Sequence, residues 1–164
     1  MVKIHKGSTR TDFEIIEKLA DTIWRNHYIP LVGKAQIDYM LAKYQSAEAI
    51  ENQVADGFEY YVLNYSKIPV GYIAIKQETN SLFLSKIYVL KTFRGKKIGK
   101  SAMDFIEEKA KAYHLNAIRL TVNIHNADAI AAYEKLGFVN IGPLVTDIGN
   151  GFVMDDYEMQ KKFK

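Results

Sequence analysis

The chain has 164 residues, of which 48% are apolar and 25% charged, and its formal net charge is +3. These values predict one folded domain spanning residues 1–164 and argue against intrinsic disorder. The lack of cysteine excludes a disulfide framework, a thiolate nucleophile and a cysteine-ligated metal site. Because the sequence also lacks a signal-peptide pattern and an apolar run near the ~20 residues that cross a bilayer, we expect a cytoplasmic protein.

The first part of the chain predicts a short strand and a long helix. Residues 2–7 are typical of a strand, and either Ser8 or Thr11 is expected to cap the helix that follows. Apolar side chains then recur at the spacing of one helical face. They are Ile16, Leu19, Ala20, Ile23 and Trp24. Pro30 and Gly33 are expected to break this helix.

Two short helices and three strands are predicted next. The helices lie around residues 37–44 and 46–54. Aromatic and β-branched residues then indicate strands at 58–65, 68–78 and 82–90. With short turns between them, these strands are expected to form an antiparallel meander.

The remaining elements complete a mixed sheet. We expect a helix at 99–113, a strand at 117–123, a helix at 127–136 and two strands near 138–144 and 152–160. The order β-ααα-βββ-α-β-α-ββ predicts an α/β (α+β) fold. Its sheet would be mixed, mostly antiparallel, of about seven strands, and flanked by helices.

A cationic loop between a strand and a helix is the most informative segment. Within ten residues it carries five cations and no acid: Lys91, Arg94, Lys96, Lys97 and Lys100. It also contains Gly95 and Gly99, which allow close backbone approach. Free N–H groups at a helix start and nearby cations attract phosphate oxygens. A solvated loop is the plain alternative, but we predict a phosphate-bearing ligand.

The same loop superficially resembles a nucleotide-binding P-loop. That motif needs four residues between its first glycine and Gly-Lys-Ser/Thr. Only three separate Gly95 from Gly99, Lys100 and Ser101. The spacing, and the little α/β structure left after the loop, disfavour a nucleotidase.

Two patterns instead resemble the signatures of the GNAT acetyltransferase superfamily. The first is Arg/Gln-x-x-Gly-x-Gly/Ala at a strand-to-helix turn, which Arg94 and Gly99 match. Lys97 stands at the middle glycine, so we expect it to adopt an unusual φ or to hold a phosphate further away. Residues 126–138 resemble the second signature, Asn-x-x-Ala-x-x-x-Tyr-x-x-x-Gly-Phe. The separation of the two patterns and the element order over residues 1–160 also agree.

This resemblance implies an N-acetyltransferase that moves an acetyl group from acetyl-CoA to a primary amine, without a metal. The strands at 82–90 and 117–123 would splay, and the pantetheine arm would pair with main chain between them. The residues implied to bind acetyl-CoA are Ile87, Tyr88, Val89, Arg94, Gly95, Lys96, Lys97, Ile98, Gly99, Lys100 and Asn126. Asn126 also fits a plain helix N-cap.

Tyr133 is the implied catalytic residue, because a phenol beside the sulfur can protonate the leaving thiolate. An ordinary half-buried aromatic is the alternative. The base that deprotonates the amine stays open, since strand 82–90 holds no acid where many relatives place a glutamate. Glu59, Glu78 or water leading to a backbone carbonyl are the alternatives.

The acceptor pocket is expected between the first two helices, with Trp24, His27 and Tyr28 as candidate substrate-binding residues. The alternatives are that Trp24 is core and His27 is solvated. This segment resembles a bacterial polyamine acetyltransferase branch, in which Asp21 and Asp38 would attract a cationic amine.

The sequence is also compatible with two other functions. One is an acetyl-CoA-binding protein without turnover, and the other is an acetyltransferase acting on a protein N-terminus or lysine. We expect no nucleic-acid or membrane partner and a homodimer.

Overall fold

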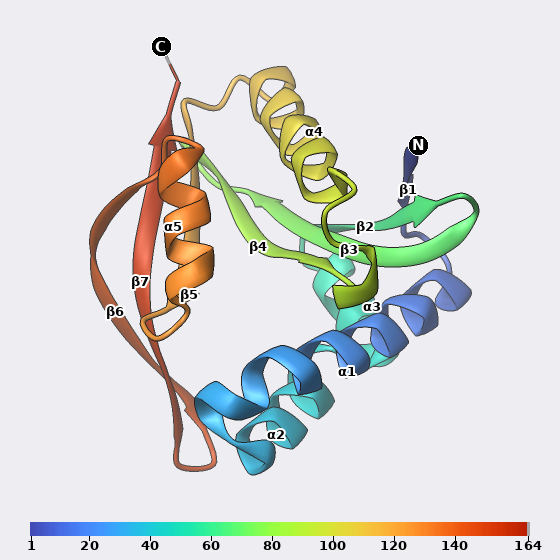
Figure 1. Ribbon diagram of the computed structural model, residues 1–164, viewed down its shortest axis with the longest axis vertical. Helices are drawn as coiled ribbons and strands as arrows, with labels where there is room; N and C mark the ends of the chain where they lie inside the picture. The colour runs from blue at the N-terminus through green and yellow to red at the C-terminus, as the bar shows by residue number, and fades with distance from the viewer. Residues whose placement is uncertain (164) are drawn as a thin grey trace.

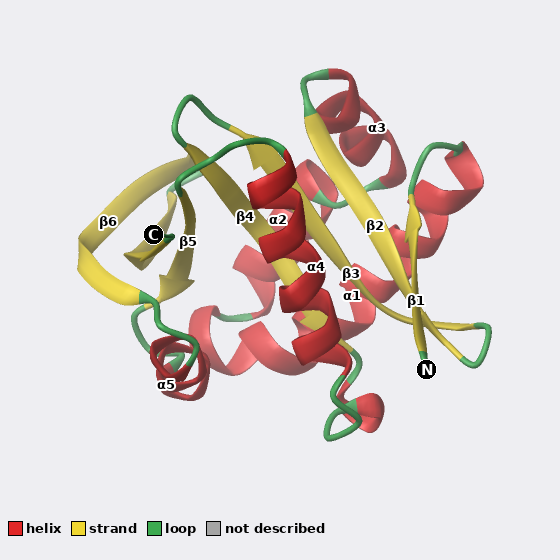
Figure 2. Ribbon diagram, turned by 90° about the horizontal axis from the view of Figure 1, so that it is seen from above, coloured by secondary structure: helices red, strands yellow, loops and turns green. Residues whose placement is uncertain are grey.

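A seven-stranded sheet with helices on both faces is built from residues 1–163, the part of the chain that the computed structural model describes. Figures 1 and 2 show α4 on one face and α1, α2 and α3 on the other. The elements are β1 (Val2–Lys6), α1 (Arg10–Val32), α2 (Lys34–Tyr44), α3 (Ala47–Ala55), β2 (Phe58–Tyr65), β3 (Ile68–Gln77), β4 (Ser81–Val89), η1 (Lys91–Phe93), α4 (Ile98–Ala112), β5 (Ala117–Asn123), α5 (Ala127–Lys135), β6 (Val139–Gly149) and β7 (Phe152–Lys162). Apart from the short 3-10 helix η1, this order confirms the prediction.

The sheet opens at its centre. Its strand order is β1-β2-β3-β4-β5-β7-β6, and every neighbouring pair is antiparallel except β4 with β5. Only Ser81–Phe83 pairs with Ala117–Arg119, although β4 continues to Val89 and β5 to Asn123. The two strands therefore diverge beyond Phe83, as the family resemblance implied.

A β-bulge redirects the side chains of β4. The register shift between β3 and β4 leaves Ser85 without a partner, between Leu84 and Lys86. Leu84 belongs to the core beneath α4, whereas Tyr88 packs with the core beneath α1. Because a bulge reverses the side on which later side chains point, Lys86 and Tyr88 face α1.

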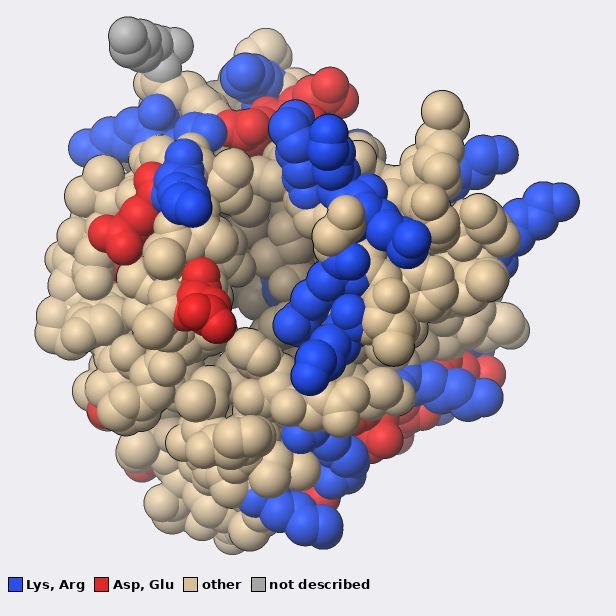
Figure 3. All heavy atoms as spheres, viewed as in Figure 1, with Lys and Arg blue, Asp and Glu red and all other residues tan. Residues whose placement is uncertain are grey.

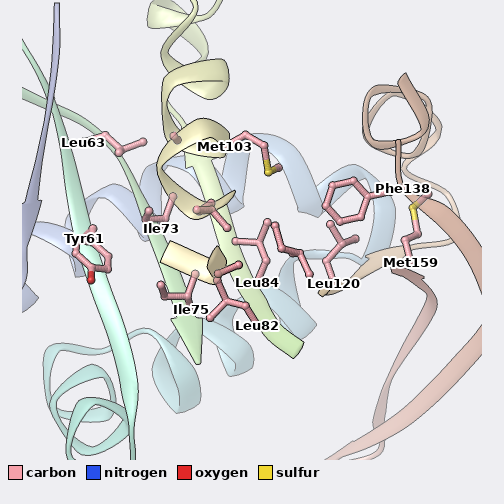
Figure 4. Packing of buried hydrophobic residues seen from close by; sticks show 14 of the residues in the cluster. Tyr61, Leu63, Ile73, Ile75, Leu82, Leu84, Met103, Leu120, Phe138 and Met159 are labelled. Atoms are coloured by element: carbon pink, nitrogen blue, oxygen red, sulfur yellow. The ribbon is translucent and has the colours of Figure 1, made fainter. Parts of the chain in front are cut away.

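Two apolar cores hold the helices to the sheet. On one face, Ile73 and Leu84 of the sheet pack with Met103 of α4 (Figure 4). On the other face, the predicted apolar stripe of α1 is buried and includes Ile16 and Trp24. Apolar burial on both faces fixes the separation of α1 and α4, and with it the space where the strands diverge.

The cap of α1 differs from the prediction. Thr9, rather than Ser8 or Thr11, is the N-cap residue, and its hydroxyl accepts a hydrogen bond from the Asp12 N–H at 3.2 Å. The Asp12 carboxylate accepts the Thr9 N–H in return. This reciprocal capping box satisfies two free donors, which a lone hydroxyl could not do.

The expected break at Pro30 is also wrong. The helix α1 runs through Pro30 to Val32 and ends at Gly33, whose φ is 88°. A proline inside a helix removes one hydrogen bond to the carbonyl four residues before it, and the last turn of α1 continues in spite of that loss. Within residues 1–163, no helix is long and apolar enough to cross a membrane.

Candidate active site

A cavity of about 1140 Å³ occupies the space where β4 and β5 diverge. Its lining comes from both strands, the loop before α4, helices α1, α2, α4 and α5, and strands β6 and β7. Figure 3 shows the hollow, with Lys and Arg gathered on one rim over α4 and its preceding loop. A cationic rim and a deeper chamber thus belong to one cavity.

The cationic loop presents the open start of a helix to this cavity. Lys97 is the N-cap residue of α4 and has φ 62°, which confirms the unusual backbone angle expected of it. Its side chain does not cap the helix, so the first N–H groups remain available to a ligand. A side chain at Gly95 or Gly99 would meet no heavy atom within 4 Å. With Arg94 also in the lining, the loop fits a diphosphate.

Two of the predicted cations turn away from the cavity. The Lys96 ammonium lies 5.8 Å from the ring centre of Tyr65, and the Lys100 ammonium lies 3.1 Å from the Asp104 carboxylate. Neither lysine belongs to the cavity lining. Their candidate role is therefore limited to their main-chain N–H groups.

The predicted pantetheine strip lies along the free side of β4. Ile87, Tyr88 and Val89 line the cavity beyond the point where β5 stops pairing. Strand edges of this kind leave main-chain donors and acceptors for an extended ligand.

Tyr133 enters the same cavity from α5. It is half-buried, and its ring packs edge-to-face on Phe138 with centroids 5.7 Å apart. Burial raises the pKa of the Tyr133 phenol, and the neighbouring Tyr28 adds to the effect. The phenol therefore stays protonated at neutral pH, as a proton donor must.

Asn126 and His27 join α5 to α1. The Asn126 side-chain oxygen accepts the Ala129 N–H at 3.4 Å, so its NH₂ group faces His27 Nε2 at 2.9 Å. Burial, and then the charge of Arg94, lower the pKa of His27. We therefore assign a neutral His27 that accepts the Asn126 hydrogen bond, rather than a solvated side chain.

An aromatic wall forms the α1 side of the cavity. The hydroxyl groups of Tyr28 and Tyr88 form a hydrogen bond with an oxygen–oxygen distance of 2.9 Å. Trp24 is buried and lines the cavity, and its indole N–H donates to the Tyr72 hydroxyl at 3.0 Å. That hydroxyl donates to Gln45 at 2.7 Å. Trp24 is thus core and lining at once, while the strand tyrosines were not predicted to contribute side chains here.

Two charged groups of the cavity, one buried and one half-buried, are marked by no sequence pattern. Asp156 of β7 is 4% exposed, and Lys86 of β4 donates to the Ser85 hydroxyl at 2.8 Å. Both line the cavity. Burial raises the pKa of Asp156 to about 6 and lowers that of Lys86 to about 8. Neither residue lies in a motif, and only the bulge in β4 and the β5–β7 register bring them to this space.

The carboxylates considered as bases lie elsewhere. Arg119 binds both oxygens of Glu78, one of them at 2.8 Å, while the Tyr113 hydroxyl donates to Glu59 at 2.9 Å. Neither acid belongs to the cavity lining. Both carboxylate alternatives for the base are therefore wrong, because these groups already hold structural partners. The alternative of water leading to a backbone carbonyl stays a prediction.

The expected role of Asp21 and Asp38 is wrong as well. Arg25 binds Asp21 at 2.9 Å and Asp38 at 2.7 Å, and Lys34 adds a second contact to Asp38. These four residues lie outside the cavity lining. The amphipathic pattern of α1 turns its charged face away from the sheet, so these acids neutralise local cations.

Comparison with known proteins identifies the family. A model of the acetyltransferase (GNAT) domain matches residues 30–161. An "IAA acetyltransferase" of Azospirillum brasilense is 37% identical over 73 residues, which cover 44% of this chain and 48% of that protein. The match thus spans about half of that relative. An "N-alpha-acetyltransferase 30" of Dictyostelium discoideum is 27% identical over 132 residues, covering 70% of this chain and 68% of that protein.

Solved structures show the same fold. The PaiA N-acetyltransferase of Thermoplasma acidophilum, solved in complex with coenzyme A, superposes with a TM-score of 0.84 at 23% identity, covering 99% of both chains. The ribosomal-protein-S18-alanine N-acetyltransferase of Escherichia coli gives 0.74 at 16% identity, covering 99% of this chain and 94% of that one. Since the family match takes in most of the sequence, the chain belongs to the GNAT acetyltransferase family.

Proposed function

We propose that the chain transfers an acetyl group from acetyl-CoA to the primary amine of a small molecule. The observation that carries this proposal is one cavity that joins an uncapped, cationic helix start to a buried chamber containing the Tyr133 phenol. The coenzyme A in the Thermoplasma acidophilum relative supports the same donor.

Different residues of the chain would serve different steps of the reaction. Acetyl-CoA, when bound, supplies an acetyl group activated as a thioester. Arg94 and the α4 N–H groups would hold its diphosphate, and the free side of β4 would align the arm and place an N–H on the thioester oxygen. Tyr133 would donate a proton to the leaving sulfur. The chamber between α1 and the sheet would then receive the amine.

The acceptor class rests on the chamber and on the names of relatives. The name "IAA acetyltransferase" supports a small-molecule acceptor, whereas "N-alpha-acetyltransferase 30" supports the alternative of a protein N-terminus. A polyamine remains a prediction from the sequence resemblance. The pairing of Asp21 and Asp38 with Arg25 removes one argument for it.

A thiol-release assay tests this proposal. The purified chain with acetyl-CoA is presented with polyamines, monoamines, amino acids and short peptides with free N-termini. We expect free thiol to form only with particular small amines, and mass spectrometry to find the acetylated amine. Release with peptides alone would favour the protein acetyltransferase. Acetyl-CoA binding without release for every amine would favour a binding protein without turnover.

We also propose a cytoplasmic homodimer. The edge strand β6 exposes Val139, Ile141 and Val145, and an apolar sheet edge favours pairing with another copy. Light scattering coupled to gel filtration should give twice the chain mass. Replacing Val145 with Lys should shift the protein toward the monomer, and a monomeric wild-type chain would contradict the dimer.

A further inference from the structure

The carboxylate of Asp156 is a buried group without a partner in the described chain. The residue is 4% exposed, lines the cavity, and makes no side-chain hydrogen bond or ion pair with residues 1–163. Within residues 1–163, every side-chain oxygen or nitrogen of a non-exposed residue that is sealed from solvent has a hydrogen-bond partner. The Asp156 oxygens therefore reach the cavity itself, where a ligand can contact them.

The groups around Asp156 leave it as a carboxylate that can act on a ligand. Asn123 of β5 and Leu144 of β6 are its strand partners, and neither is ionisable. The ionisable groups that interact electrostatically with it are Asp155 of β7, Lys86 of β4 and Tyr28 of α1. The other ionisable residues of the cavity lining are His27, Tyr44, Tyr88, Arg94, Lys97, Arg119, Asp128 and Tyr133. The positive charge of Lys86 favours the ionised carboxylate but makes no ion pair with it in the described chain.

The reaction needs such a group. Amines with lysine-like pKa values near ~10 are almost fully protonated at neutral pH and carry no free electron pair. Glu59 and Glu78 are engaged outside the cavity. The other carboxylate in the lining, Asp128, is exposed on the first turn of α5. Asp156 is thus the one buried carboxylate of the described lining.

We propose that Asp156 takes the proton from the acceptor's ammonium group before the amine attacks the thioester. This inference deepens the proposed function and rests on it. The ammonium gives one proton to Asp156, and the freed nitrogen pair forms the C–N bond while the C–S pair goes to sulfur. Tyr133 protonates the sulfur and regains a proton, through water, from the new amide nitrogen. The proton on Asp156 then leaves to solvent, so that one proton is released for each acetyl group transferred.

The replacement Asp156→Asn, compared with Asp155→Asn, tests this role. Asp155 is the neighbouring exposed carboxylate, so both changes remove one charge from β7. At pH 7, we expect Asp156→Asn to lower kcat/KM for the amine by roughly 100-fold or more. Asp155→Asn should stay within about threefold of wild type.

The pH profile separates proton transfer from simple positioning. In wild type, kcat/KM should rise with pH through a pKa of about 6, the value for Asp156. In Asp156→Asn that limb should vanish, and the defect should shrink as the pH approaches the amine's own pKa near ~10, since solution then supplies free amine. Asp156→Glu, which keeps a carboxylate, should retain the limb. Calorimetry should find the same acetyl-CoA affinity in all these variants, which checks that they fold.

The possible failures are distinguishable. A wild-type level of kcat/KM in Asp156→Asn, an equal loss at every pH, or a missing limb in Asp156→Glu would each overturn the role of Asp156 while leaving the acetyltransferase intact. A wild-type chain that acetylates no amine would overturn the proposed function, and the role of Asp156 with it.

Discussion

The two sides of the cavity are built in different ways. The donor side comes from a nearly continuous stretch, residues 87–100, and offers mainly main-chain groups and exposed cations. The acceptor side brings together side chains from α1, α2, β4, β5 and β7. Donor binding should therefore tolerate most side-chain changes, whereas acceptor chemistry should depend on single buried groups. Each of the following changes tests that contrast.

The largest effect is expected at Tyr133. In Tyr133→Phe the ring still packs on Phe138, but the leaving sulfur has no phenolic proton. We expect kcat to fall by roughly 100-fold or more, with an unchanged acetyl-CoA affinity. Steady-state kinetics and calorimetry measure the two quantities. Tyr157→Phe, at a tyrosine packed against the core beneath α4, is the control. Equal kcat values for wild type and Tyr133→Phe would remove Tyr133 from the mechanism.

Arg94 is the strongest single side chain expected on the donor side. Charge-assisted hydrogen bonds contribute about 1.5–3 kcal/mol, so Arg94→Ala should weaken acetyl-CoA binding by roughly 10- to 100-fold in calorimetry. Lys100→Ala is the matched control, because that ammonium binds Asp104, and it should change the affinity by less than about threefold. Equal losses in both variants would show that total charge, rather than placement, governs donor binding.

The buried carboxylate of Asp156 should lower the free energy of unfolding, although it serves catalysis. Its pKa is raised to about 6 in the folded chain, so the folded state holds this proton more tightly than the unfolded state. Stability should then fall as the pH rises from about 4 to 6, and the penalty persists above that range. Asp156→Asn should raise the free energy of unfolding at pH 8 by roughly 1–3 kcal/mol. Urea unfolding at pH 4 and 8 measures this gain, and a destabilised variant at pH 8 would indicate a structural role instead.

The smallest effect is expected at Lys97. Its φ of 62° is strained for a residue with a Cβ atom, so Lys97→Gly should raise the free energy of unfolding by up to about 1 kcal/mol. Lys96 is not among the described residues with positive φ. Lys96→Gly removes the same charge and should instead lower stability by about 0.4–1 kcal/mol. Thermal unfolding compares the pair, and equal shifts would contradict the strain.

The sequence predicts the fold and the donor side for the same reason. Periodic patterns mark the elements, and consecutive residues such as Arg94 and Gly99 form the loop. In α1 the sequence patterns gave two wrong local details, because Asp12 selects Thr9 as the cap and the helix continues past Pro30 to Val32.

Such patterns do not predict the side chains of the acceptor side. Lys86 reaches the cavity only because Ser85 is bulged, and Asp156 only because β7 pairs with β5 in a particular register. The contacts of Arg119 with Glu78 and of Arg25 with Asp38 were equally unpredictable, because they join residues distant in the sequence. Which side chains meet in the cavity depends on how the elements pack, and this cannot be read from any short segment of the sequence.

The central claim is that the diverging strands place a thioester beside Tyr133, and a crystal structure with bound coenzyme A tests it most directly. We predict the diphosphate on the α4 N–H groups and the sulfur within about 3.5 Å of the Tyr133 hydroxyl. A sulfur lying outside the cleft between β4 and β5, or remote from that hydroxyl, would contradict the account.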